Sequence, residues 1–149
     1  MNPTGELIKK YFEAHNRHEV ESVKAMLADS HVFSTCHGME MSGDQYVATI
    51  GSLMEAFPDV HFDIRKVYVE GDKEYADIVV TGTHTGPAWG VGDLPKIETT
   101  GIKCTMDPEK IELEQDANGK ITKLAIVECG AISGPMGFYQ SIGGKLPSS

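Results

Sequence analysis

The sequence lacks any cluster of basic residues and any long apolar run. Its 149 residues include 22 aspartates and glutamates against 13 scattered lysines and arginines, and the formal net charge is −9. A nucleic-acid interface needs a basic surface that neutralises phosphates, and anionic membranes likewise attract basic segments. No run approaches the ~18 apolar residues that span a bilayer. These absences predict no nucleic-acid partner and no membrane association.

Cysteine is also scarce, because the chain has only Cys36, Cys104 and Cys129. An odd number of cysteines cannot pair completely within one chain, and no two of them form a C-x-x-C motif. Free, mostly buried thiols in a reducing compartment are the simplest interpretation. Residues 1–15 lack the apolar core of a signal peptide. We therefore expect a cytoplasmic protein.

Motifs for nucleotide, nucleophile or metal chemistry are missing too. The sequence has no P-loop, G-x-S-x-G, H-E-x-x-H or dinucleotide-binding fingerprint. Cys36 and His37 are adjacent, but a zinc site needs three or four ligands at suitable spacing, so local turn contacts are the expected role. Asp107, Glu109 and Glu128 would meet across a predicted hairpin, where we expect a solvated acidic edge. No metal is therefore expected.

Apolar residues recur at helical spacing in the first part of the chain and near its end. The spacing predicts four helices, near residues 7–15, 20–27, 42–57 and 135–142. The third has the clearest start, because Ser42 and Gln45 form a capping box, with Met41 and Tyr46 as a hydrophobic staple. Pro58 then prevents the helix from continuing.

Much of the remaining sequence has the pattern of β-strands. Strands are predicted over residues 31–35, 60–70, 74–85, 100–114 and 120–130. Turns at Gly71-Asp72 and Asn118-Gly119 join the last four strands into two hairpins, and Pro108 predicts a bulge or an edge. Helices followed by antiparallel strands, without βαβ alternation, indicate one α+β domain over residues 1–149. The helices are expected to close over one face of a bent sheet.

Several short fragments occur in an order and spacing that belong to a known fold. They are HNRHE at 15–19, MLAD at 26–29, AFPDV at 56–60, EGD at 70–72, GTHTG at 82–86, TG at 100–101 and NGKI at 118–121. Together they make the chain resemble the SnoaL-like polyketide cyclase branch of the nuclear-transport-factor-2-like superfamily, across nearly its full length.

The resemblance implies a cone-shaped barrel in which a curved antiparallel sheet wraps around N-terminal helices and encloses one apolar cavity. It also implies a homodimer formed through the outer sheet face. Family members include cyclases that close polyketides by cofactor-free acid/base chemistry, while relatives isomerise ketosteroids, hydrolyse epoxides or only bind ligands. The leading hypothesis is a cofactor-independent acid/base enzyme of cyclase, isomerase or lyase type, acting on a small, largely apolar carbonyl compound. The alternative is a non-catalytic small-molecule-binding module.

The last strand departs from the family pattern, in which an aspartate after an aromatic residue serves as the acid/base. Counting from residues 119–121 without a gap, Ala125 takes the aromatic position and Cys129 takes that of the aspartate, with Glu128 beside it. Neighbouring residues of a strand point to opposite faces unless a bulge intervenes. Either Glu128 enters the cavity as a general acid or base, or it faces solvent. Cys129 is a weaker acid/base candidate or ordinary packing.

His84 is the other candidate catalytic residue. It shares a strand face with Ile78, Val80 and Gly82, and Gly82 leaves space beside it. If Glu70 pairs with Lys73 across the turn, the same register places Asp59 opposite His84, where its carboxylate would orient the imidazole. Alternatively, His84 is a histidine tethered at a strand end without a chemical role.

The predicted walls of the cavity come from helices, a strand and a loop. Substrate-binding candidates are Phe12, Ile50, Met54, Ile78, Val80 and Trp89. Trp89 lies in the Gly/Pro-rich loop 86–98 and either covers the ligand or pins the loop to the sheet. Residues 121–127 have apolar side chains on both faces of their strand, which favours a homodimer that covers the outer one.

Overall fold

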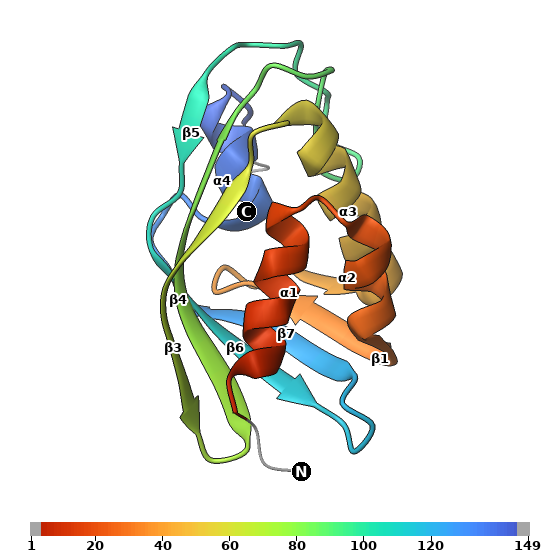
Figure 1. Ribbon diagram of the computed structural model, residues 1–149. Coiled ribbons are helices and arrows are strands. Elements are labelled where there is room, and N and C mark those ends of the chain that lie inside the picture. The colour runs from red at the N-terminus through yellow and green to blue at the C-terminus, as the bar shows by residue number, and fades with distance from the viewer. Residues whose placement is uncertain (1–3, 146–149) are drawn as a thin grey trace.

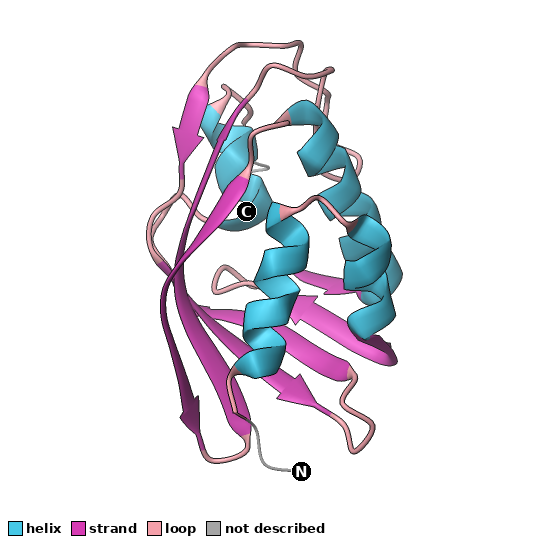
Figure 2. Ribbon diagram, viewed as in Figure 1, coloured by secondary structure: helices cyan, strands magenta, loops and turns pink. Residues whose placement is uncertain are grey.

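The computed structural model describes residues 4–145 and shows a bent sheet that wraps around helices on one side (Figures 1 and 2). The predicted α+β class and nuclear-transport-factor-2-like barrel are confirmed. The elements follow the order α1 (Glu6–Asn16), α2 (Val20–Met26), β1 (Leu27–Ser34), β2 (Glu40–Ser42), α3 (Gly43–Ala56), β3 (His61–Glu70), β4 (Lys73–Thr83), β5 (Lys103–Thr105), β6 (Glu109–Gln115), β7 (Ile121–Glu128) and α4 (Gly134–Ser141). Among the described residues, no helix has the length and apolar character required to cross a membrane.

The sheet has the order β2-β1-β7-β6-β4-β3, and the short β5 also pairs with β4. All its pairs are antiparallel except one, because β1 runs parallel to β7, with Ser34 beside Ala125. A parallel pair requires a long crossover connection, and here α3 and five strands separate its two members in sequence. The chain segments that leave β1 and β7 consequently emerge side by side.

The predicted irregularity at Pro108 is a bulge between β5 and β6. Both strands pair with β4, which places Thr105 beside Thr81 and Glu109 beside Ile78. The four residue steps from Thr105 to Glu109 therefore lie opposite only three steps along β4, from Thr81 to Ile78. Proline cannot donate to the sheet ladder, and the extra residue lets it sit outside the pairing.

Helix α3 begins as the capping box predicts. The Ser42 Oγ accepts from the Gln45 backbone N–H at 3.2 Å, and the Gln45 Oε1 accepts from the Ser42 N–H at 2.9 Å. The helix ends at Ala56, before Pro58. Two donors that a helix start would otherwise leave unpaired are thereby satisfied locally.

The core lies between the inner face of the sheet and helices α1, α3 and α4 (Figure 1). Burying each large apolar side chain contributes roughly 1.5–3 kcal/mol. The helices contribute to this core Ile8, Phe12, Ile50, Leu53 and Phe138. The strands contribute Ile78, Val80, Ile111, Leu113, Leu124 and Ile126. Side chains alternate along the strands, so the same elements present polar residues outward.

The outer face of the sheet is mainly charged and aromatic rather than apolar. Glu112 forms ion pairs with Lys73 and Lys123, at 3.5 and 3.6 Å. Tyr68 and Tyr75 stack with ring centroids 5.3 Å apart. The expected apolar outer face is thus reduced to single side chains, and the homodimer stays a prediction.

Candidate functional site

A cavity of about 50 Å³ lies between the helices and the sheet. Among the predicted wall residues, Phe12, Ile50, Ile78 and Val80 line it, whereas Met54 packs in the core away from it. One water-sized group occupies roughly 10–15 Å³ by the same kind of measure, so the space holds only a few atoms. Pockets for drug-sized ligands are about 300–1,000 Å³, and a larger ligand would require the walls to move.

Glu109 supplies the carboxyl group of this cavity. The first residue of β6, it lies on the inner face beside Ile111, and its side chain is buried. Its Oε2 accepts a hydrogen bond of 3.1 Å from the Gly134 backbone N–H. Burial raises the pKa of Glu109 to about 7, although the Gly134 hydrogen bond lowers it in part. A carboxyl group with this pKa can both accept and donate a proton near neutral pH.

Tyr46 is the other polar residue in the cavity wall, and a buried histidine holds it in place. The His15 Nδ1 lies 2.6 Å from the Tyr11 carbonyl oxygen and must donate to it. The His15 Nε2 is then left to accept from the Tyr46 hydroxyl, at 2.7 Å. Burial lowers the pKa of His15 to about 4 and raises the pKa of Tyr46. Both groups are therefore neutral at physiological pH and act as a rigid support.

The predicted pairing of Asp59 with His84 does not form. A bulge between Ile64 and Lys66 shifts the β3–β4 register by one residue, so that His61 pairs with Thr81 and Asp59 reaches Thr83. The Asp59 carboxylate accepts from the Thr83 backbone N–H at 2.6 Å and from its hydroxyl at 2.8 Å. These hydrogen bonds lower the pKa of Asp59 against a desolvation effect that raises it. Asp59 is an exposed cap at the strand end.

His84 lies outside the cavity and fastens the loop that follows β4. Its Nε2 donates to the Pro87 carbonyl at 3.0 Å, and its Nδ1 accepts from the Thr100 backbone N–H at 3.3 Å. The space beside Gly82 is filled, because a Cβ there would lie 3.2 Å from Phe57 and 3.3 Å from Phe138. The tethered role considered from the sequence is the one that the geometry favours.

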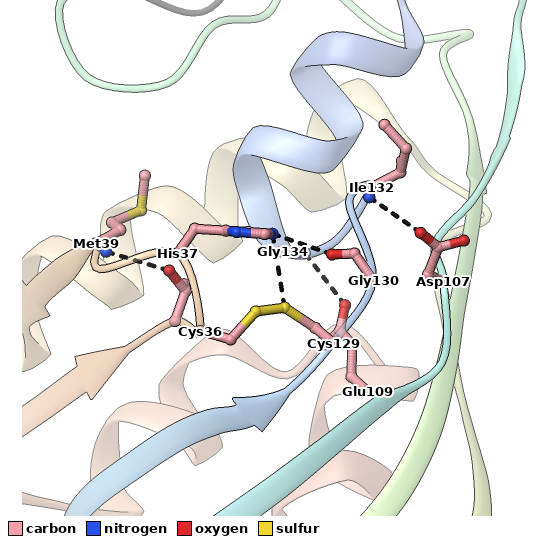
Figure 3. Close-up of a disulfide and its surroundings, with 10 residues drawn as sticks. Cys36, His37, Met39, Asp107, Glu109, Cys129, Gly130, Ile132 and Gly134 are labelled. Atoms are coloured by element: carbon pink, nitrogen blue, oxygen red, sulfur yellow. Dashed lines mark hydrogen bonds between the residues drawn. A yellow bond between two sulfur atoms is a disulfide. The ribbon is translucent and has the colours of Figure 1, made fainter. Parts of the chain in front are cut away.

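Glu128 and Cys129 also lie away from the cavity. A bulge at Val127 shifts the β6–β7 register, and the Glu128 side chain is 72% exposed, 3.3 Å from the Lys110 ammonium. Cys129 forms a disulfide with Cys36 (Figure 3). The expectation of three free thiols was wrong for this pair, and it holds for the buried Cys104.

Trp89 pins its loop to the fold instead of covering the cavity. Its side chain is buried, its Nε1 donates to the Ser52 hydroxyl at 3.1 Å, and its ring meets Phe57 edge to face. The loop carries a second tie, since the Tyr139 hydroxyl donates to the Pro95 carbonyl at 2.6 Å. Of the two roles considered for Trp89, the structure shows the loop pin.

Glu109 was placed by the sequence on a solvated acidic edge with Asp107 and Glu128. One signal could have separated it from them, because it shares the period-2 face of Ile111 and Leu113. A carboxylate on an apolar strand face is costly to bury unless it has a role or a partner. The expected acidic edge assumed a regular hairpin. The bulges at Pro108 and Val127 instead separate Glu109 from the two acids expected beside it.

His37 completes a cluster with the disulfide. The ligand atoms of Cys36, His37 and Cys129 all lie within 4.8 Å of one another. These residue types suit zinc when the sulfurs are thiolates. In the disulfide the two sulfurs are bonded to each other, so this state of the cluster does not fit a zinc ion.

Comparison with known proteins gives the fold and the family. Many solved structures are similar to this chain, and three serve as examples. The candidate hydroxylase AclR from Streptomyces galilaeus has 22% sequence identity and a TM-score of 0.66, and the match covers 80% of this chain and 71% of that one. A candidate SnoaL-like polyketide cyclase from Jannaschia sp. CCS1 has 18% identity and a TM-score of 0.64, with 80% of this chain and 81% of that one covered. A candidate polyketide cyclase from Xanthomonas campestris pv. campestris has 18% identity and a TM-score of 0.62, with 93% of this chain and 95% of that one covered. No curated protein matches the sequence. The sequence model of the SnoaL-like polyketide cyclases matches residues 5–127, and the chain therefore belongs to this family.

Proposed function

We propose that this protein is a cofactor-independent acid/base enzyme that acts on a small, largely apolar carbonyl compound in its internal cavity. Glu109 moves the proton. The observation that carries the proposal is a buried carboxyl group in an apolar wall, with a pKa raised to about 7. Membership of a polyketide cyclase family supports cyclase-like chemistry on a carbonyl substrate.

The reaction step is a proton transfer next to a carbonyl. Ionised Glu109 removes a proton from the carbon beside the carbonyl and leaves an enolate. The protonated carboxyl then returns that proton to carbon or to oxygen, so that the enzyme ends unchanged. The raised pKa of Glu109 favours this proton transfer, because a more basic carboxylate is better matched to the weakly acidic C–H group beside the carbonyl. The apolar wall also keeps out water that would compete for the proton.

The rest of the wall selects the substrate by size and polarity. Its surface is mostly aliphatic and aromatic, and the Tyr46 hydroxyl is already engaged with His15. A cavity of about 50 Å³ admits only a compact group unless Pro135 and Phe138 move outward. We therefore expect activity on small cyclic or branched ketones before larger polyketide chains.

Deuterium exchange tests the proposal without knowledge of the natural substrate. Small apolar ketones are incubated with the protein in deuterated buffer, and NMR follows loss of the proton beside the carbonyl. The wild-type protein should accelerate exchange, and Glu109→Gln should reduce it about 100-fold or more. Glu128→Gln is the matched control, since that carboxylate is exposed outside the cavity. Equal exchange by wild type and Glu109→Gln would refute the assignment.

A non-catalytic binding module is the second candidate function. It is favoured by one observation, the disulfide-bonded cysteine at the position where the family pattern has an acid/base aspartate. In that case ketones of suitable size should bind to wild type and to Glu109→Gln, detected as chemical-shift changes of Ile78 and Ile126, with no exchange by either protein. Catalysis and binding are thus separated by the same samples.

A cytoplasmic location and a homodimer remain proposals. The location rested on free thiols and on the lack of a signal-like apolar segment in residues 1–15, and the Cys36–Cys129 disulfide removes the first argument. The homodimer rests on the family resemblance and on the exposed part of the outer sheet face.

A further inference from the structure

The Cys36–Cys129 disulfide joins the segments that follow two neighbouring strands, β1 and β7. Cys36 lies in the loop after β1, Cys129 directly follows β7, and their Cα atoms are 6.3 Å apart (Figure 3). Cys36 is exposed, whereas Cys129 is half-buried. An incoming thiolate therefore reaches the Cys36 sulfur more easily, and Cys129 would be the leaving group.

His37 is placed to assist that leaving group. Its Nε2 lies 3.6 Å from the Cys129 Sγ and 3.0 Å from the Gly130 carbonyl oxygen, to which it donates (Figure 3). A thiolate formed on Cys129 would be a second acceptor within reach of the same N–H. Hydrogen bonding to a thiolate stabilises it and speeds its departure.

Residues 130–134, which follow Cys129, are held by Asp107, in the bulge between β5 and β6, and by Glu109 at the start of β6. The Asp107 backbone N–H donates to the Ile132 carbonyl at 2.8 Å, and the Ile132 N–H donates to the Asp107 Oδ2 at 3.0 Å. The Gly134 N–H donates to Glu109. Gly130 packs so closely against the Asp107 side chain that a Cβ there would collide with its carboxylate. The disulfide is the only covalent tie across this region, within residues 4–145.

The same segment forms a wall between the cavity and the surface. A surface groove of about 480 Å³ lies on its outer side, lined by residues that include His37, Met39, Ser133 and Pro135. Pro135 lines the cavity as well as this groove, and Gly134 lines the cavity. An outward shift of residues 130–135 would therefore connect the groove with the cavity, at the point where Glu109 is held.

We propose that Cys36–Cys129 is a thiol-exchange site whose reduction releases residues 130–134 and opens the cavity. Its co-reactant is a dithiol, either small or carried by a protein. One thiolate of the dithiol bonds to the Cys36 sulfur, and the Cys36–Cys129 bond breaks with its electron pair on Cys129, which then takes up a proton. The second thiolate attacks the mixed disulfide, so the dithiol is oxidised by two electrons and both cysteines become thiols.

Thiol counting under native conditions tests the first half of the proposal. Before reduction, the unfolded protein should yield one thiol, from Cys104. Incubation of the folded protein with dithiothreitol should add two accessible thiols without unfolding. His37→Ala should slow this reaction roughly tenfold, because the leaving group loses its donor. His61→Ala, an exposed histidine on β3, is the matched control and should react like wild type.

Hydrogen–deuterium exchange tests the second half. Reduction should remove protection from the Ile132 and Gly134 amides and leave the β3–β4 hairpin at residues 70–73 unchanged. The Cys36→Ser/Cys129→Ser variant should match the reduced protein, and Cys104→Ser should match the oxidised one. These readouts rely on no enzymatic activity, so they are independent of the function proposed above.

Three results would overturn the proposal. Three thiols counted before reduction would show that the disulfide does not form. Reduction that occurs only as the whole chain unfolds would show a purely structural bond. A stoichiometric metal ion in the isolated protein, held by Cys36, His37 and Cys129, would assign the cluster to metal binding instead.

Discussion

The Gly134 N–H donates a hydrogen bond of 3.1 Å to the Glu109 Oε2, and this contact links the carboxyl group of the cavity to the first residue of α4. One oxygen of Glu109 is thereby oriented, and the other is left for a ligand. The same bond couples the position of the 130–134 segment to the environment of the carboxyl. Chemistry in the cavity and movement of its wall are therefore expected to depend on each other.

The buried carboxyl should make stability depend on pH. The folded pKa of Glu109 is about 7, above its ordinary value of 4.5, so the folded state holds a proton that the unfolded state has lost. The contribution of Glu109 to the free energy of unfolding is fully present below pH 4.5. It decreases as pH rises from 4.5 to 7, by about 3 kcal/mol in total. His15 acts in the opposite direction, since its folded pKa is about 4 and stability falls as pH drops from 6.5.

Urea unfolding of wild type and Glu109→Gln between pH 4.5 and 8 isolates the Glu109 contribution, because His15 is common to both proteins. Glutamine cannot ionise, so the difference in unfolding free energy should move by about 3 kcal/mol in favour of the variant as pH rises. A difference that stays constant over this range would show that Glu109 titrates normally.

His84→Ala should destabilise the fold rather than impair the cavity. The imidazole ties Pro87 to Thr100 and stacks on Phe57 with ring centroids 5.2 Å apart. Losing buried packing and leaving these backbone groups unpaired should cost roughly 2–4 kcal/mol. Thermal unfolding measures the change, and ketone exchange should be unaffected well below the melting temperature. A variant as stable as wild type but inactive would restore His84 as a candidate catalytic residue.

Reduction of the disulfide should lower stability measurably. It closes a loop of 93 residues, and a cross-link over such a distance stabilises by up to about 4–5 kcal/mol through the entropy of the unfolded chain. Guanidine unfolding with and without reductant gives the value. Cys104→Ser, which retains the disulfide, should show the same loss on reduction, while Cys36→Ser/Cys129→Ser should show none.

The homodimer prediction can be tested at the exposed part of the outer sheet face. Val127 is 39% exposed there, on the strand next to the one that carries Lys110. If this face is the interface, Val127→Lys should raise the dimer dissociation constant at least roughly tenfold, since an apolar contact is lost. Sedimentation velocity at micromolar concentration measures both proteins. A wild-type protein of single-chain mass would contradict the prediction.

Local interactions are the part of this structure that the sequence determined by itself. The Ser42–Gln45 capping box, the turns at Gly71-Asp72 and Asn118-Gly119 and the bulge at Pro108 all form where expected. Each depends on residues a few positions apart, and their steric and hydrogen-bonding preferences act in any context. The α+β class follows from the order of these elements, together with the family resemblance.

The candidate site was decided by the tertiary structure. A single extra residue between Ile64 and Lys66 moved Asp59 from His84 to Thr83, and nothing in the sequence marks that bulge. Cys36 and Cys129 meet because β1 pairs in parallel with β7, whereas the sequence predicted antiparallel strands throughout. Glu109 is buried because α4 and the 130–134 segment close over it. A shift of the register by one residue turns every following side chain of the strand to the opposite face of the sheet. Long-range strand pairing, rather than local preference, therefore determined which groups face the cavity.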